Sequence, residues 1–475
     1  MKKYLFGLFR AERITIMQKF TINSLKKNSH IHFIGIGGIS MSGLAHIALS
    51  NGFKVSGSDR EKTNITQKLE NNGATIYEGH DKKNIDGADL IVHTAAVKSD
   101  NPEMAEAARL NIPVIDRAEF LGAIMKNYKH AVGVAGTHGK TTTTSMLAHA
   151  LIYADSDPTI SVGGELDLIG GNIHCGSSDL FVTEACEYTN SFLKFYPTIA
   201  LITNIEEDHL DFFTGIDMIR QSFRDYAELT RNGGYTVAFG DDENIRLTLD
   251  GSGLNIITYG INKCNNYYAQ NIKYLAGYPS FDVICDNKVI CHISLNVPGE
   301  HNILNALATV AVCEILGVDP ETAAKGIETF KGTHRRFEKK GIINGAIVID
   351  DYAHHPTEIK ATLKAAKKFS PKRIRCIFQP HTYSRTRTLW NDFLTAFDDV
   401  DELILTHIYA AREQYDGVTD PQRLSDEICE RGINSKYIES FCDIEKYIDD
   451  TAQEGDIIFT MGAGDITQIG TNLFK

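Results

Sequence analysis

Short apolar runs that end in polar or charged residues recur along most of this chain. The clearest runs are residues 131–135, 179–183, 198–203, 346–349 and 374–379. Uninterrupted apolar runs are typical of strands covered on both faces, and the helical patterns between them predict parallel sheets flanked by helices. Ligands bind at the carboxyl ends of the strands in such sheets, so the polar residues that follow each run are candidates for function.

The alternation of strands and helices falls into three blocks. We expect an α/β protein with a Rossmann-like N-terminal domain (31–128), a central domain with a parallel sheet of the P-loop ATPase type (129–331) and a Rossmann-like C-terminal domain (332–475). Residues 1–30 form an extension whose role the sequence does not assign. Regular patterning begins only near His32, so Met17 is an alternative start.

The strongest chemical signal is the segment Gly136-Thr137-His138-Gly139-Lys140-Thr141-Thr142, between an apolar run and a helical pattern. A strand, a glycine turn and a helix start aim backbone N–H groups at one point, as a phosphate requires. Lys140 adds a positive charge and Thr141 a hydroxyl for Mg²⁺. The usual spacing places a glycine at position 134, where Val134 stands, so Gly136 must close the arch. The alternative is a plain glycine turn before a threonine-rich helix.

A second glycine turn, Gly35-Ile36-Gly37-Gly38, follows the first predicted strand. The next strand ends at Asp59, where an acid in a dinucleotide-binding unit meets a ribose hydroxyl. Ser40 stands in place of the third glycine of that fingerprint. By itself this segment suggests a nicotinamide-dependent oxidoreductase, a hypothesis that leaves the Lys140 loop without a role.

Two strand ends carry candidate ligands of a metal ion. Glu184 follows the run 179–183, and its carboxylate is suited to complete the coordination of Mg²⁺ begun by Thr141; the alternative is a surface acid. His209 lies between Asp208 and Asp211, which are suited to orient it, to bind metal or only to solvate a turn.

Two further pairs come from the helix after Gly299 and from the second domain junction. Asn302 and Asn305 share one helix face, so their amides either read an adenine edge or, for Asn302, cap the helix. Arg335 and Arg336 either stabilise a transferring phosphoryl group or form a solvated basic pair.

Composition narrows the class of protein. The net charge of −13 argues against a nucleic-acid partner, which requires a basic face. No apolar run approaches the roughly 18 residues that a membrane span needs. The nine cysteines include no Cys-x-x-Cys pair, which favours free thiols in a reducing compartment. We therefore expect a cytoplasmic protein without a nucleic-acid or membrane partner.

Taken in order, the motifs resemble those of the Mur ligases. The resemblance rests on the shortened phosphate loop, on segments 203–211 and 301–305, on Arg336-Phe337-Glu338 and on Asp351-Tyr352-Ala353-His354-His355-Pro356. It also includes segments 35–43, 381–386, 408–413 and 462–466, and it runs from about His32 to the C-terminus. Thr382 stands where some relatives carry arginine, and Cys186 stands where other members carry aspartate.

The resemblance implies an ATP-dependent amide-forming ligase with a nucleotide-sugar-binding N-terminal domain. ATP phosphorylates the lactyl carboxylate of UDP-N-acetylmuramate, and the amine of L-alanine attacks the acyl phosphate. Related members that add a peptide or another amino acid to the same nucleotide sugar are the alternative. The implied cofactors are ATP and Mg²⁺, with two ions, and we expect a monomer or a homodimer.

The resemblance also assigns roles to individual residues. Catalytic roles go to Lys140, Glu184, His209, Arg336, Asp351 and His354, and metal binding goes to Thr141, Glu184 and His209. ATP binding goes to Gly136, Thr137, His138, Gly139, Lys140, Thr141, Thr142, His301, Asn302, Asn305, Arg336 and Asp351. Binding of the UDP-sugar is assigned to Gly35, Ile36, Gly37, Gly38, Asp59, Thr94 and Ala95. Binding of the amino acid and the muramoyl group is assigned to Tyr352, His354, His381 and Arg385.

Overall fold

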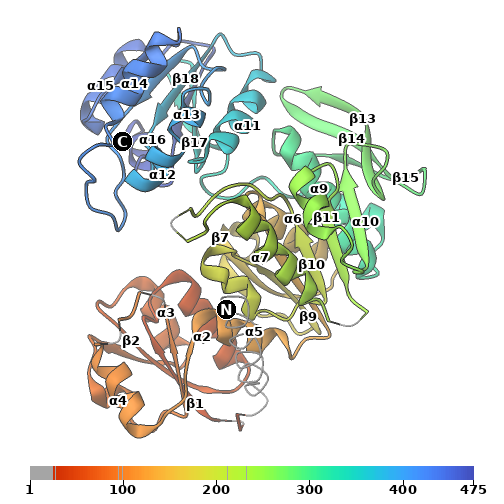
Figure 1. The fold of residues 1–475 in the computed structure, drawn as a ribbon, viewed down its shortest axis with the longest axis vertical. Helices are drawn as coiled ribbons and strands as arrows, with labels where there is room; N and C mark the ends of the chain where they lie inside the picture. The colour runs from red at the N-terminus through yellow and green to blue at the C-terminus, as the bar shows by residue number, and fades with distance from the viewer. Residues whose placement is uncertain are drawn as a thin grey trace, which may run out of the picture.

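The computed structural model describes residues 25–26, 28–94, 96–98, 100–210, 212–231 and 233–474. The expected extension 1–30, the alternative start at Met17 and the candidates Ala95 and Asp211 lie wholly or largely outside these residues. Three α/β domains follow one another along the long axis of the molecule (Figure 1), so the predicted fold class is confirmed. Among the described helices, none has the length and apolar character needed to cross a bilayer.

The N-terminal domain has five parallel strands in the order β3-β2-β1-β4-β5. This order is that of a Rossmann-like sheet, as predicted, and it places the glycine turn after the central strand β1. The strands are β1 (His30–Ile34), β2 (Lys54–Asp59), β3 (Thr75–Glu78), β4 (Leu90–His93) and β5 (Val114–Asp116), and the helices are α2 (Ile39–Ser50), α3 (Asn64–Asn71), α4 (Pro102–Leu110) and α5 (Arg117–Met125).

The central domain has one sheet in the order β15-β14-β13-β12-β11-β10-β6-β9-β7-β8. Its middle strands are parallel, as predicted, but β8 and the hairpins β13–β15 are antiparallel. The strands are β6 (His130–Ala135), β7 (Thr159–Leu166), β8 (Gly171–His174), β9 (Leu180–Glu184), β10 (Ile199–Ile202), β11 (Tyr235–Phe239), β12 (Ile256–Gly260), β13 (Tyr267–Leu275), β14 (Tyr278–Cys285) and β15 (Lys288–Ser294). The helices are α6 (Lys140–Tyr153), α7 (Ile216–Glu228), α8 (Glu243–Leu249), α9 (Glu300–Ile315) and α10 (Pro320–Glu328).

The C-terminal domain has a sheet in the order β16-β17-β21-β18-β19-β20, parallel except for the edge strand β16. The strands are β16 (Glu338–Ile343), β17 (Ala346–Asp351), β18 (Arg373–Phe378), β19 (Glu402–Leu405), β20 (Ser435–Tyr437) and β21 (Asp456–Met461). The helices are α11 (Pro356–Lys367), α12 (Tyr383–Thr388), α13 (Trp390–Phe393), α14 (Pro421–Glu430), α15 (Phe441–Thr451) and α16 (Thr467–Asn472).

Buried apolar residues on both faces of each sheet form the core, which agrees with the uninterrupted apolar runs of the sequence. The predicted boundary after residue 128 falls between α5 and β6, and the one after residue 331 falls between α10 and β16. The carboxyl ends of β6, β9, β10 and β17 carry the candidate residues, so these strand ends define the place to look for a site.

Candidate active site

The predicted phosphate loop connects β6 to α6, and two of its glycines are required by the backbone. Gly136 has a φ of +141°, and a Cβ there would lie 1.9 Å from the hydroxyl oxygen of Thr203. Gly139 caps α6 with a φ of 82°. The end of β10 braces the loop, since the N–H of His138 donates to the Asn204 side chain at 2.8 Å. The first N–H groups of α6 therefore face one anion site.

Lys140 folds back over this loop and pairs with a carboxylate that the sequence analysis missed. Its Nζ donates to the carbonyl of Thr137 at 3.1 Å and to Glu187 at 3.0 Å. Burial lowers the pKa of Lys140, but the Glu187 charge outweighs it and raises the pKa above its usual value. The Nε2 atom of His209 lies 3.7 Å from the same carboxylate. Glu187 thus links two predicted catalytic residues, and its only signal in the sequence is its place three residues after Glu184.

Thr141 and Glu184, the predicted ligands of a first metal ion, lie together. Glu184 ends β9 and accepts the N–H of Gly163 at 2.6 Å. Burial raises the pKa of Glu184, against a hydrogen bond from Thr141 and the charges of Lys140 and Arg336. A hydroxyl and a carboxylate are oxygen donors of the kind that Mg²⁺ prefers, so this pair fits that ion.

His209 lies on the far side of Glu187, where its ring centroid is 4.6 Å from that of Tyr188. It has a left-handed backbone, with a φ of 52°. Asp208, expected to orient His209, has an oxygen 3.8 Å from Nε2 of His209. Its other oxygen accepts a hydrogen bond from Nη2 of Arg385 in α12 at 3.0 Å. Burial raises the pKa of Asp208 and the Arg385 charge outweighs it, so the carboxyl stays ionised.

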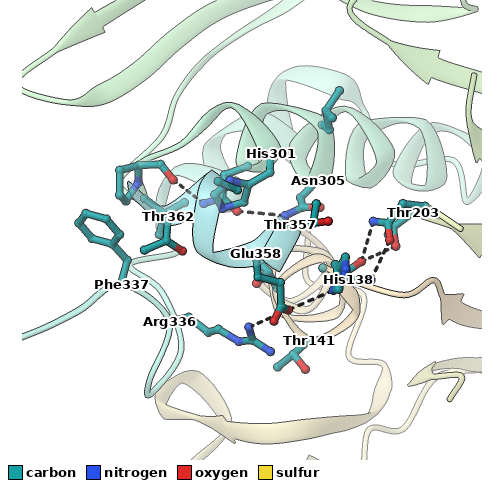
Figure 2. A pocket seen from close by; sticks show the side chains of 18 of the residues that line it. His138, Thr141, Thr203, His301, Asn305, Arg336, Phe337, Thr357, Glu358 and Thr362 are labelled. Atoms are coloured by element: carbon teal, nitrogen blue, oxygen red, sulfur yellow. Dashed lines mark hydrogen bonds and ion pairs between the residues drawn. The ribbon is translucent and has the colours of Figure 1, made fainter. Parts of the chain in front are cut away.

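A cavity of about 300 Å³ lies between the phosphate loop, α9 and the first turn of α11 (Figure 2). Its size is at the lower end of the range of small-molecule sites. Predicted ATP residues in its lining are His138, Gly139, Thr141, Thr142, His301, Asn302, Asn305, Arg336 and Asp351. Apolar side chains of Phe239, Leu304 and Phe330 also line it, which suits a flat base next to a charged phosphate chain.

The two asparagines of α9 are buried and bonded to each other. Asn305 Nδ2 donates to Asn302 Oδ1 at 3.0 Å, and Asn302 Nδ2 donates to the carbonyl of Pro298 at 2.6 Å. The Thr143 hydroxyl of α6 donates to Asn305 at 3.1 Å, so this pair joins α9 to the phosphate loop helix. The alternative that Asn302 caps the helix is wrong, because Gly299 occupies the N-cap position. Neighbouring His301 stays neutral, since burial and the charge of Arg336 lower its pKa to about 4.

The arginine pair at the second junction separates into two roles. Arg335, with a φ of 60°, turns into the C-terminal domain, where Nη2 donates to the carbonyl of Gly462 at 2.6 Å. Arg336 turns into the cavity and lies 5.2 Å from the ring centroid of Tyr352. A solvated basic pair is therefore excluded, and of the two arginines only Arg336 lines the cavity.

Asp351, at the end of β17, is buried next to Phe337, near the start of the C-terminal domain. It accepts the N–H groups of Phe337 and Ala353, each at 2.8 Å. Burial raises the pKa of Asp351 to about 6 despite the Arg336 charge and these two hydrogen bonds. A carboxyl with this pKa is mostly ionised at neutral pH, and a cationic or metal-bound ligand in the cavity would favour the ionised form further.

A group of polar side chains joins the phosphate loop to the C-terminal domain. His138 lies 3.2 Å from Glu358 and 3.6 Å from Glu206, two carboxylates that the sequence analysis did not select. Burial lowers the pKa of His138, but the two carboxylates outweigh burial and raise it to about 9. The Thr357 hydroxyl donates to Glu206 at 2.6 Å across the same junction. The sequence signal for Glu358 was a glutamate three residues after His355, the pattern of a capping box.

His138, Glu206 and His355 bring donor atoms within 4.8 Å of one another. Both ring nitrogens of His355 are nevertheless in use. Its Nδ1 accepts the N–H of Thr357 at 3.3 Å, and its Nε2 faces the carbonyl of Glu207 at 3.2 Å. A metal ligand needs a free ring nitrogen, so this group serves the domain contact rather than an ion.

A second cavity of about 510 Å³ opens where α12 faces the loop after β10. His381 and Arg385 line it together with Tyr188, Asp208 and His209. Arg385 Nη1 lies 3.1 Å from His381 Nδ1. The other two residues predicted for this subsite lie next to His381. The ring centroid of His381 is 5.8 Å from that of His354, and the ring centroid of His354 is 5.6 Å from that of Tyr352. Burial and the Arg385 charge lower the pKa of His381 to about 4; His354 has a pKa of about 4 as well, lowered mainly by burial.

The predicted UDP-sugar loop follows β1 and lies beside the central domain. Gly35 has a φ of +82°, and a Cβ there would lie 2.7 Å from the methyl group of Thr94. Asp59 accepts the N–H of Gly37 at 2.8 Å, so the acid is held by the glycine loop itself. Ile36 is fully buried, and Gly38 caps α2 without a side chain. Asn172 of the central domain donates to the carbonyl of Ile39 at 3.2 Å, directly after the loop.

The fold and this geometry define a three-domain enzyme with a P-loop, in which residues of the central and C-terminal domains line one cavity. Three family models match the chain: the Mur ligase family catalytic domain at residues 30–129, the Mur ligase middle domain at 134–313 and the Mur ligase glutamate ligase domain at 335–464. The chain belongs to the Mur ligase family.

Individual relatives narrow the comparison. The chain is 53% identical over 445 residues to a UDP-N-acetylmuramate–L-alanine ligase of Clostridium botulinum, covering 94% of this chain and 97% of that one. A UDP-N-acetylmuramate–L-alanine ligase of Caldanaerobacter subterraneus is 53% identical over 452 residues, with 95% and 98% covered. The solved UDP-N-acetylmuramate–alanine ligase of Thermotoga maritima superimposes with a TM-score of 0.76 at 32% identity, over 94% of this chain and 98% of that one.

Proposed function

We propose that this protein joins L-alanine to the lactyl carboxylate of UDP-N-acetylmuramate and converts ATP to ADP and phosphate. The observation that carries the proposal is the cavity between the Lys140 loop and Arg336, in a chain that matches ligases of that name over 94% of its length. Cytoplasmic peptidoglycan precursor synthesis is the setting that fits a nucleotide-sugar substrate and nine free cysteines among the described residues.

In the first step the lactyl carboxylate oxygen attacks the γ-phosphorus of ATP and ADP leaves. Two anions must approach each other, so the site has to neutralise charge. Lys140 of the central domain and Arg336 of the C-terminal domain both act with their charges on Glu184, and the first N–H groups of α6 add further positive potential. We assign binding of the adenosine part to the cavity around His301, Asn302 and Asn305, with Asp351 beside it.

In the second step the amine of L-alanine attacks the acyl carbon, phosphate leaves and the nitrogen loses a proton. Burial keeps His354 neutral with a pKa of about 4, so its lone pair is available to the amine proton, although a base this weak does not hold that proton at neutral pH. We assign the amino acid and muramoyl group to Tyr352, His354, His381 and Arg385. Holding the amine and the acyl phosphate in register supplies up to roughly 7–11 kcal/mol of the barrier.

Mg²⁺ is the proposed cofactor, because the donors present suit it. Thr141 and Glu184 would hold one ion and His209 a second, next to Glu187. When bound, such ions neutralise the phosphate oxygens and polarise the γ-phosphoryl group. In the N-terminal domain we assign the UDP-sugar to Gly35–Gly38, Asp59, Thr94 and Ala95.

The test is phosphate release from Mg-ATP with UDP-N-acetylmuramate, with and without L-alanine. Release that needs both substrates and yields the alanyl adduct supports the proposal. Release that needs the nucleotide sugar and an L-alanyl peptide instead would assign the chain to the peptide-adding members. Absence of release under every combination, or micromolar binding of a nicotinamide nucleotide, would overturn the proposed reaction.

A further inference from the structure

The side chain of Glu358, in the first turn of α11, contacts three residues of the proposed active site, and no role has been assigned to it so far. One oxygen lies 3.2 Å from Nδ1 of His138 and 3.5 Å from Nη1 of Arg336. The other lies 3.4 Å from Nδ1 of His354. Figure 2 shows Glu358 between Arg336 and His138, at the wall of the nucleotide cavity. One carboxylate therefore contacts the phosphate loop, the arginine and the proposed proton acceptor.

The second oxygen is anchored by the backbone. It accepts the N–H of His354 at 3.2 Å and of His355 at 3.4 Å, which completes the capping box of α11. The carboxylate cannot turn toward another partner without uncapping the helix. Its first oxygen is thereby fixed in direction and points at the two cationic side chains.

The surroundings keep this group ionised. The side chain is only 12% exposed, and burial acts to raise its pKa. The charge and the hydrogen bond of His138, together with the charge of Arg336, outweigh burial and hold the pKa of Glu358 well below its usual range. Hydrogen bonds and ion pairs with ionised partners in such a site are about twice as strong as neutral ones, so they fix geometry as well as charge.

We propose that Glu358 is a positioning residue for phosphoryl transfer, which holds Arg336 and the phosphate-loop His138 in place across the junction of the central and C-terminal domains. Its chemistry is that of a fixed internal anion, and it makes no bond to the substrates. The expected change in kcat rests on the proposed function, because kcat is measured for the ligase reaction. The expected change in ATP binding does not depend on which amino acid or nucleotide sugar the enzyme uses.

The matched test compares Glu358→Gln with Glu119→Gln. A glutamine keeps the capping box but removes the charge, and Glu119 is the equivalent glutamate of the capping box of α5 in the N-terminal domain. We expect E358Q to weaken the binding of a fluorescent ATP analogue about tenfold and to raise KM for ATP and lower kcat by similar factors. E119Q should bind and turn over within about twofold of the wild type.

Several outcomes decide the inference. A merely structural role would reduce the active fraction and kcat but leave KM and nucleotide affinity unchanged, so that pattern overturns the proposal. Wild-type affinity in E358Q also overturns it. If E358Q does not fold, Glu358→Asp keeps the charge but shortens the reach, and wild-type nucleotide affinity in that variant is the contrary result. The nucleotide titration needs no acceptor, so failure of the wild type to use L-alanine would overturn the proposed function and leave this test intact.

Discussion

The two domain junctions of this molecule are built from different contacts. Between the N-terminal and central domains, one continuous cluster of buried apolar residues spans the junction, and a Cβ at Gly122 would lie 1.9 Å from the carbonyl of Lys194. Between the central and C-terminal domains, His138 meets Glu358 and Asp208 meets Arg385. Among the described residues, no cluster of buried apolar side chains spans this second junction.

The difference indicates which domain moves. Separating an apolar junction exposes surface at roughly 25 cal/mol per Å², whereas buried ion pairs that open recover their desolvation penalty, which offsets much of the lost attraction. We therefore expect the C-terminal domain to open and close and the N-terminal domain to stay attached to the central one. Arg336 belongs to the C-terminal domain and Lys140 to the central one, and both charges act on Glu184, so we expect the proposed phosphoryl-transfer site to be complete only when the polar junction is closed.

The largest effect is expected for a variant of the proposed phosphoryl-transfer site. Lys140→Ala should lower phosphate release by at least about 10³-fold, because it removes the charge that the proposed transferring phosphoryl group meets. The far-UV circular dichroism spectrum should be unchanged. Turnover within about tenfold of the wild type would contradict the assignment of the phosphate loop.

Gly122→Ala tests the apolar junction. Alanine favours the interior of α5 by about 1 kcal/mol, so a loss of stability can come only from the contact with Lys194. We expect a loss of at least about 2 kcal/mol, measured by urea unfolding with a domain-specific fluorescence probe. The control is Gly171→Ala, where a Cβ meets no atom within 4 Å. Equal stability of the two variants would mean that this junction is not closely packed.

Local rules carried most of the prediction of the fold. The apolar runs at residues 346–349 and 374–379 correspond to β17 and β18, and the glycines of the phosphate loop lie at the turn between β6 and α6. The antiparallel hairpins β13–β15 were not predicted, because alternating half-buried strands lack an uninterrupted apolar run.

The candidate site was only partly predictable, for a related reason. Glu358 and His138 are 220 residues apart, and their contact depends on how two domains meet. No local pattern encodes such a contact. The different orientations of Arg335 and Arg336 depend on the left-handed backbone of Arg335, which sequence rules for a non-glycine residue do not indicate. Glu187 was overlooked because its partner Lys140 belongs to another strand end.

A matched pair of ion-pair variants sharpens the comparison. Asp208→Asn removes the pair with Arg385 at the polar junction, and Lys194→Met removes the pair with Asp116 at the apolar one. In small-angle scattering without substrates we expect a larger radius of gyration only for D208N. We also expect kcat/KM of D208N to fall about tenfold, since a buried charged partner is lost. Equal expansion of both variants would contradict the view that one junction opens and the other does not.

A pH dependence tests whether charge holds the polar junction closed. His138 faces Glu206, Glu358 and His355, and the two carboxylates raise its pKa to about 9 from 6.5. A group whose pKa is raised on folding stabilises the folded state fully below its unfolded pKa, and that contribution is lost as the pH rises through the folded pKa. The contribution is on the order of 3 kcal/mol at most.

The measurement is the thermal midpoint of the wild type minus that of His138→Asn, followed from pH 6 to pH 10. We expect the difference to be constant up to about pH 6.5 and to shrink by a few degrees as the pH approaches about 9. Asparagine keeps a polar side chain but cannot carry the charge, so changes common to both proteins cancel. A difference that stays constant to pH 10 would mean that His138 is not charged in the closed state. Among the described residues, the ion pairs left at the polar junction would then include Asp208 with Arg385 and Glu300 with Lys364, and the charge of Glu358 would act on Arg336.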